Sequence, residues 1–260
     1  MNRRWLLAAT PVILLVTHYV AVLPHEFSHS IMAWLTGIKP TPGDIDWGGT
    51  GLWNIFLLAH VDENVDYSAA LAAGHHWQVA MAAAAGPVIG NALPYLLVRR
   101  WLFRWRLQPA GLYVVFWYLF FSLVNVYDYV PLRTFAPDGD VTHFVEGSGV
   151  SRWWIYAVVT PLVVWGTADL YRRVLPTVLE RVGFARAERA VLLVVATASF
   201  FGYFAIPALE ESDPVTLFLG RTSLLLIPIV VVATWRRVVG TPTGDDPVTT
   251  VPTPAEPARR

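Results

Sequence analysis

Three residues near the N-terminus have the types and the spacing of a metal-dependent hydrolytic site. His25, Glu26 and His29 form the pattern H-E-x-x-H. On a helix, residues i and i+4 lie on one face, so both imidazoles can reach a single metal ion. Glu26 projects beside them and can take a proton from a metal-bound water. The pattern predicts a metal site; the alternative is a pair of histidines that pack in a core or at an interface.

The motif lies inside an apolar stretch that runs from Trp5 to Gly37. Ionisable groups in or near a membrane span are costly to bury, and they are usually functional. The surroundings of the motif therefore favour the metal site over chance packing.

The composition identifies a membrane protein. The chain has 260 residues, of which 55% are hydrophobic and only 15% are charged, against about 25% charged residues in a soluble domain. Its formal net charge is zero, so no basic surface indicates a nucleic-acid partner. The chain has no cysteine, so a zinc ion would be held by His, Asp, Glu or water.

The apolar runs predict an all-α fold with about six transmembrane helices. The run at 5–23 is long enough to span, and we expect its helix to continue through the motif to about residue 35, where Gly37 and Pro40 end it. The later spans are expected at 77–98, 109–127, 153–169, 190–207 and 216–235.

The polar segments divide the chain into parts. Residues 38–76 form a polar, Gly-rich insert after the first span, with weak strand character that is compatible with a small β-hairpin. Residues 146–237 hold the last three spans. Residues 238–260 are rich in Pro and Thr, and we expect a disordered tail there.

The positions of the basic residues predict the orientation. Arginines gather before the first span, at 99–106, at 172–189 and after the last span. Because positive residues favour the cytoplasmic side, we expect a multi-pass protein of the plasma (inner) membrane with both termini in the cytoplasm.

The third metal ligand must come from another part of the chain, because a catalytic zinc ion usually has three protein ligands and a water. The first and third spans end on the same face of the membrane. Asp138 or Asp140 can therefore reach an ion held by the two histidines, and Asp128 and His143 are weaker candidates. The alternative for the two aspartates is that Asp-Gly simply forms a turn.

The second span has features that suit close packing. Gly86 and Gly90 make a small-xxx-small face that another helix can approach. Pro87 frees a backbone carbonyl inside the span, and Asn91 needs a polar partner. We expect either a kinked packing helix or a helix whose kink and Asn91 face the metal.

Taken in order, these elements resemble the site-2 protease family of intramembrane zinc metalloproteases. The resemblance covers about residues 5–145, so we expect 1–145 to be a three-span metalloprotease-like core. The chain departs from the family pattern in a longer Asn-to-Asp spacing and in Pro137, where Leu is typical. The motifs are His25-Glu26-Phe27-Ser28-His29, Ala85-Gly86-Pro87 followed by Asn91, and Asn125 followed by Pro131 and Asp138-Gly139.

The resemblance implies an activity and a role for each residue. The chain would be a zinc-dependent endopeptidase that cleaves membrane-embedded or membrane-proximal peptide bonds of a membrane protein substrate in the lipid bilayer. Zn²⁺ would be bound by His25, His29 and one of Asp138 and Asp140. Glu26 would be the general base and then the acid, and Asn91 and Asn125 would hold the substrate backbone or the oxyanion.

Two other functions fit the same residues. The chain could keep the fold and the metal as a non-catalytic binder or regulator. It could also be a transporter or channel with its histidines on an ion path, although its two halves show no repeat.

Overall fold

The computed structural model describes residues 3–58 and 60–241, and every regular element among them is helical. The predicted all-α fold is therefore confirmed. The elements, with π-helical segments written η, are α1 (Arg3–Ala8), α2 (Thr10–Leu35), α3 (Leu52–Leu57), α4 (Tyr67–Ala72), α5 (His76–Ala85), η1 (Gly86–Ala92), α6 (Leu93–Trp101), α7 (Pro109–Tyr127), η2 (Asp128–Leu132), α8 (Asp140–Ser148), α9 (Arg152–Asp169), η3 (Leu170–Val174), α10 (Leu175–Val182), α11 (Arg186–Gly202), α12 (Ala205–Ala208) and α13 (Pro214–Val238).

Five helical segments among the described residues are long and apolar enough to cross a membrane, so the chain is a multi-pass membrane protein. They are His76–Trp101, Pro109–Leu132, Arg152–Val182, Arg186–Ala208 and Pro214–Val238. The predicted first span, 5–23, is divided between α1 and the first part of α2, and the 26 residues of α2 extend about 39 Å. Helix α2 is not among these five segments, so its crossing of the membrane stays a prediction.

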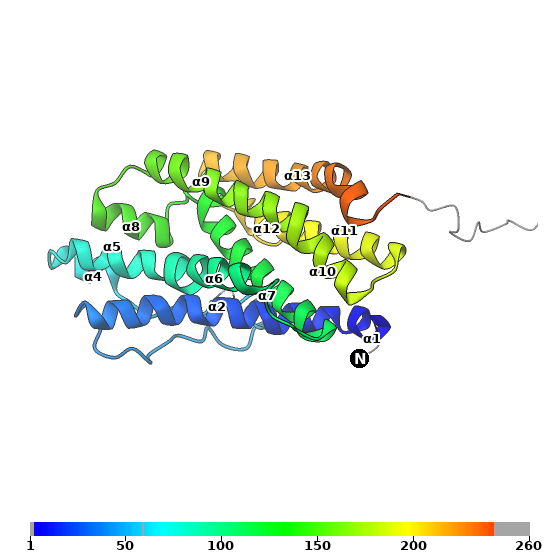
Figure 1. Cartoon of the computed structure of the whole chain (residues 1–260). Coiled ribbons are helices and arrows are strands. Elements are labelled where there is room, and N and C mark those ends of the chain that lie inside the picture. The colour runs from blue at the N-terminus through cyan, green and yellow to red at the C-terminus, as the bar shows by residue number, and fades with distance from the viewer. Residues whose placement is uncertain (1–2, 59, 242–260) are drawn as a thin grey trace, which may run out of the picture.

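The long helices lie roughly parallel in one bundle, with α1 and the end of α13 at the same end (Figure 1). Basic segments meet at that end. Arg3 donates a hydrogen bond to the carbonyl of Gly183, and Arg237 donates one to the carbonyl of Arg172. The arginine-rich segments that are far apart in the sequence are thus neighbours in space.

Helix α7 lies at the centre of the core, and its bounds agree with the predicted third span. Large aromatic side chains, among them Tyr113, Phe116, Trp117 and Phe120, are fully buried along it. It packs against α2, η1, α6 and α10. This aromatic core fixes the position of α2 and η1, the two elements that carry the motif histidines and Asn91.

The structure corrects the predicted β-hairpin of the insert. The described residues contain one isolated bridge, between Asp46 and Asp62, and no strand. The segment from Leu52, which we expected to have strand character, begins helix α3. The side-chain amide of Asn54 donates to the carbonyls of Trp47 and Gly49. These contacts hold residues 47–49 as a loop, because they take the place of the hydrogen bonds that strand pairing would make.

The insert runs back along the bundle beside α2 (Figure 1). Tyr19 of α2 donates a hydrogen bond to the carbonyl of Ile55, and Tyr203 donates one to the carbonyl of Phe56. Tyr19 lies six residues before His25, which is about 9 Å along a helix. Helix α3 therefore packs beside α2 on the N-terminal side of the motif.

Candidate metal centre

Three side chains from two distant elements meet at one point. His25 and His29 lie one turn apart on α2, and their Nε2 atoms are 3.0 Å apart. Oδ2 of Asp140, the first residue of α8, lies 3.1 Å from each of these nitrogens. All three side chains are buried or nearly so. The structure thus brings together both predicted histidines and one of the two predicted aspartates.

The spacing of the three ligand atoms fits a zinc ion. The centre of a triangle with these edges lies about 1.8 Å from each corner, whereas zinc bonds to nitrogen and oxygen are about 2.0–2.2 Å long. The three atoms are therefore close enough to one another to bind one such ion together. Two imidazoles and a carboxylate are also a donor set that zinc accepts.

The second nitrogen of each histidine is held in place. Nδ1 of His29 lies 2.7 Å from the carbonyl oxygen of Ala82, which can only accept a hydrogen bond. Nδ1 of His25 lies 2.7 Å from Oδ1 of Asn91, while Nδ2 of Asn91 donates to the carbonyl of Ala21. Both Nδ1 atoms can therefore donate, and in that tautomer the Nε2 lone pairs face the point that the two rings share with Asp140.

Two glycines allow η1 to pack this closely on the motif. A Cβ atom at Gly86 would lie 2.0 Å from Nε2 of His29, and one at Gly90 would lie 2.5 Å from Cα of His25. Both distances are far below van der Waals contact. The predicted small-xxx-small face is thus the face that meets the metal centre, and it carries Asn91 with it.

The loop before α8 places Asp140 and turns Asp138 away. Arg152 donates to the carbonyl of Ala136 and to the hydroxyl of Thr142, so it ties the loop to the first turn of α8. The Asp138 side chain is 86% exposed and pairs with His143 at 3.3 Å. Of the two predicted aspartates, Asp140 is therefore the one within reach of the histidines.

The two weaker candidates have other partners. Asp128 is buried and pairs with Arg133 at 3.6 Å. His143 stacks on Tyr67 with a centroid distance of 4.4 Å. Neither belongs to the group of ligand atoms around His25 and His29.

Glu26 is buried beside the ligands, and its carboxylate interacts electrostatically with His29 and Asp140. A second buried carboxylate, that of Glu63, interacts with both Glu26 and His29. The sequence pattern assigned Glu63 no place at the site, because it lies in the loop of the polar insert, where no spacing links it to the motif. The fold brings it there because the insert packs back on α2.

The insert is anchored beside the motif by Lys39. Its buried ammonium group donates to Oγ of Ser30 at 2.7 Å and to the carbonyls of Asp44 and Glu63. All three N–H donors are thereby used. Burial lowers the pKa of Lys39, and the three hydrogen bonds offset part of the lost hydration of the group. Ser30 follows His29 directly, so this contact fixes the insert at the metal centre.

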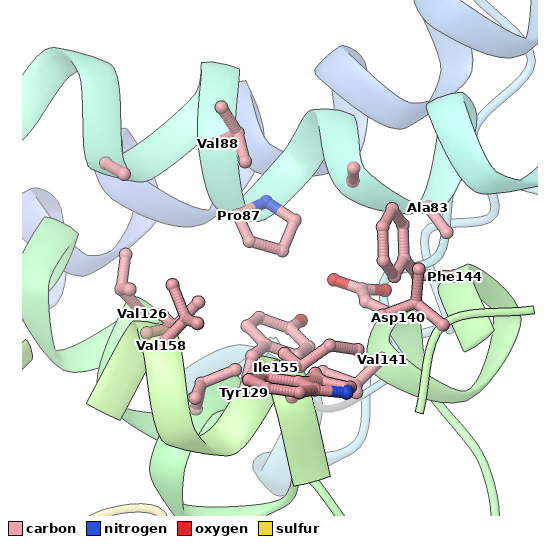
Figure 2. Close-up of a pocket in the computed structure, with 16 residues that line it drawn as sticks. Ala83, Pro87, Val88, Val126, Tyr129, Asp140, Val141, Phe144, Ile155 and Val158 are labelled. Carbon is pink, nitrogen blue, oxygen red and sulfur yellow. The ribbon is translucent and has the colours of Figure 1, made fainter. Parts of the chain in front are cut away.

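Tyr129 is a second residue that sequence reasoning missed. Its ring stacks on His25 with a centroid distance of 4.9 Å and an interplanar angle of 9°. Figure 2 shows its hydroxyl and the Asp140 carboxylate facing the same cavity. The only signal in the sequence is its position between Asn125 and Pro131, which does not indicate a direction for the side chain.

The two asparagines with a predicted substrate role are in different situations. Asn91 is fully buried and hydrogen-bonds to His25 and Ala21, so its visible role is to orient a ligand. Asn125 is buried in α7, and its Oδ1 atom has no hydrogen-bond partner within the described residues. Contact of either residue with a substrate or an oxyanion stays a prediction.

Comparison with known proteins gives no relative from which to transfer a function: no family model matches the chain, and no curated protein or solved structure matches it.

Proposed function

We propose that the chain is an intramembrane zinc endopeptidase of the site-2 protease type. One observation carries the proposal: His25, His29 and Asp140 offer three ligand atoms within 3.1 Å of one another, with Glu26 buried next to them. The ordered motifs of the first 145 residues support the same conclusion. Two buried histidines whose rings are held through Nδ1, together with one carboxylate, are a donor set that a hydrolytic zinc site uses.

The two histidines and Asp140 would hold the metal. A zinc ion bound there would supply a Lewis acid that polarises a peptide carbonyl and lowers the pKa of the attacking water. The Nδ1 contacts of His25 and His29 orient both imidazoles for this purpose. Asp140 supplies the negative charge.

The protein residues would move the proton and stabilise the developing charge. Glu26 takes a proton from the attacking water and later gives it to the leaving amine nitrogen. The Tyr129 hydroxyl, which faces the cavity beside Asp140, is a donor for the carbonyl oxygen as negative charge develops on it. Because the peptide bond of a membrane helix is hydrogen-bonded, the substrate must unwind locally before cleavage.

The membrane placement belongs to the same proposal. The described N-terminal and C-terminal ends lie at one end of the bundle together with the basic segments. By the positive-inside tendency, we propose that this end is cytoplasmic and that the protein is in the plasma (inner) membrane.

The test is cleavage by purified protein of a library of quenched fluorogenic apolar peptides, with and without Glu26→Gln. We expect the variant to keep its metal and to lose at least 99% of the activity, because it lacks the base. Glu180→Gln, on the exposed surface of α10, is the matched control and should remain active. Cleavage that persists in Glu26→Gln would refute the proposal. Loaded metal without any cleavage in wild type would favour the alternative, a non-catalytic zinc-binding protein.

A further inference from the structure

An apolar cavity of about 430 Å³ lies directly beside the metal centre. Four parts of the chain line it: η1 with the end of α5, the end of α7 with η2, α8, and α9. Figure 2 shows Pro87 and Val88 on one wall and Ile155 and Val158 on the opposite wall. Its volume is within the range of ligand-binding pockets, about 300–1,000 Å³.

The inner end of the cavity is the metal centre itself. Asp140, whose Oδ2 atom is the third ligand atom, lines it, and so does Tyr129, whose ring stacks on His25. A peptide whose scissile carbonyl lay beside Asp140 and Tyr129 would therefore have its neighbouring side chain inside this cavity.

The outer end of the cavity reaches the surface of the bundle. Val88, Trp154 and Val158 line it and are 55%, 69% and 57% exposed. They lie in two segments that can span a membrane, His76–Trp101 and Arg152–Val182, so their exposed faces adjoin lipid. The cavity thus connects a lipid-facing gap between η1 and α9 with the metal centre.

The apolar lining of the cavity favours apolar side chains over polar ones. Apart from Asp140 and Tyr129 at the inner end, every lining side chain is apolar. A charged or amide side chain would lose its hydration there without gaining a partner, whereas a large apolar side chain would gain from burial.

We propose that this cavity is the specificity pocket for a large apolar side chain next to the scissile bond, and that the substrate segment enters it from the bilayer between η1 and α9. The inference rests on the proposed peptidase function, and it adds the substrate preference and the entry path. Val158 of α9 is a specificity-determining residue, because it stands at the rim where a larger side chain would close the gap.

The first test compares two hydroxamates, which bind a metal without needing turnover. Acetohydroxamate has no side chain, whereas N-acetyl-leucine hydroxamate carries a large apolar one. We expect the leucine compound to bind the zinc-loaded wild type at least about tenfold more tightly, since one buried leucine side chain contributes about that much. Val158→Trp should reduce the ratio to below about threefold, with acetohydroxamate binding unchanged. Leu162→Trp is the matched control, because Leu162 lies one turn further on α9, is 63% exposed and is absent from the lining.

The second test does not depend on metal or activity. Because the chain has no cysteine, Val158→Cys and Leu162→Cys can each be labelled with a single dansyl fluorophore in nanodiscs. An apolar 20-residue peptide that carries one nitroxide should quench the label at position 158 several-fold more than the label at 162.

The outcomes separate the two proposals. Equal binding of both hydroxamates to wild type, or an unchanged ratio in Val158→Trp, would overturn the specificity pocket while leaving the metal site intact. Failure of both hydroxamates to bind would instead count against the peptidase function, and the quenching experiment would then decide the entry path. Equal quenching at positions 158 and 162 would overturn the proposed entry path between η1 and α9.

Discussion

At the scale of single residues, each histidine of the candidate metal site is oriented by a hydrogen-bond contact at its Nδ1 atom, on the side of the ring away from Asp140. His25 depends on a side chain, Asn91, and His29 depends on a backbone carbonyl. A backbone partner cannot be removed by substitution, but a side-chain partner can. Asn91 is therefore the residue through which the orientation of a ligand can be tested without changing the ligand.

We predict that Asn91→Leu lowers metal affinity about 10- to 100-fold, as loss of such outer contacts usually does. The cause is that Nδ1 of His25 loses its acceptor, so the ring is free to rotate and to exchange tautomers. Competition with a chromophoric chelator measures the change. Gln108→Leu replaces an exposed amide before α7 and should leave the affinity unchanged. An Asn91→Leu protein with wild-type affinity would mean that Asn91 does not orient the ligand.

At the scale of elements, the close approach of η1 to α2 holds the centre together. Gly86 faces a ligand side chain, and Gly90 faces the backbone of the motif. Neither position has room for a methyl group, so the packing distance of these two elements is set by the absence of side chains. Helix α2 is also held by its packing against α7 and by the hydrogen bond from Lys39 to Ser30.

We predict that Gly86→Ala abolishes metal binding and lowers stability by about 1–3 kcal/mol, the usual cost of overpacking. Its methyl group would displace the His29 ring. Gly111→Ala, in α7, is the matched control, because a Cβ atom there meets nothing within 4 Å; it should be neutral. Metal analysis and thermal unfolding in detergent measure both variants. Retention of metal by Gly86→Ala would show that η1 does not pack on the motif as described.

At the scale of the whole molecule, the order of the helices could be predicted well from the sequence, but the tertiary contacts between them could not. Proline and glycine bound the apolar runs, so α7 was predicted with its observed bounds and the end of α2 at Leu35 was also predicted. The β-hairpin prediction was wrong because a side chain, Asn54, satisfies the loop carbonyls that a strand would have paired.

The candidate site was predictable only where its residues share one element. His25, Glu26 and His29 follow from helical spacing, but the choice between Asp138 and Asp140 depends on the path of the loop held by Arg152. Glu63 reaches the centre through tertiary packing of the insert, and Tyr129 reaches it through the break at Val130 that follows α7. No local pattern encodes these contacts.

The arrangement of the bundle also predicts its orientation. We expect a cysteine introduced at Ser148, at the end of α8, to react with a membrane-impermeant maleimide in intact cells. A cysteine at Arg104, in the basic segment after α6, should react only after permeabilisation. Both positions are exposed, and the chain has no cysteine of its own. The reverse labelling pattern would place both termini outside the cell and invert the proposed topology.

The measurement that tests the central claim most directly is the zinc content of the purified protein and of three variants, His25→Ala, Asp140→Ala and Asp138→Ala. We predict about one zinc ion per wild-type chain, loss of zinc in the first two variants and retention of zinc in Asp138→Ala. No zinc in the wild type after reloading, or loss of zinc with Asp138 rather than Asp140, would contradict the metal centre described above.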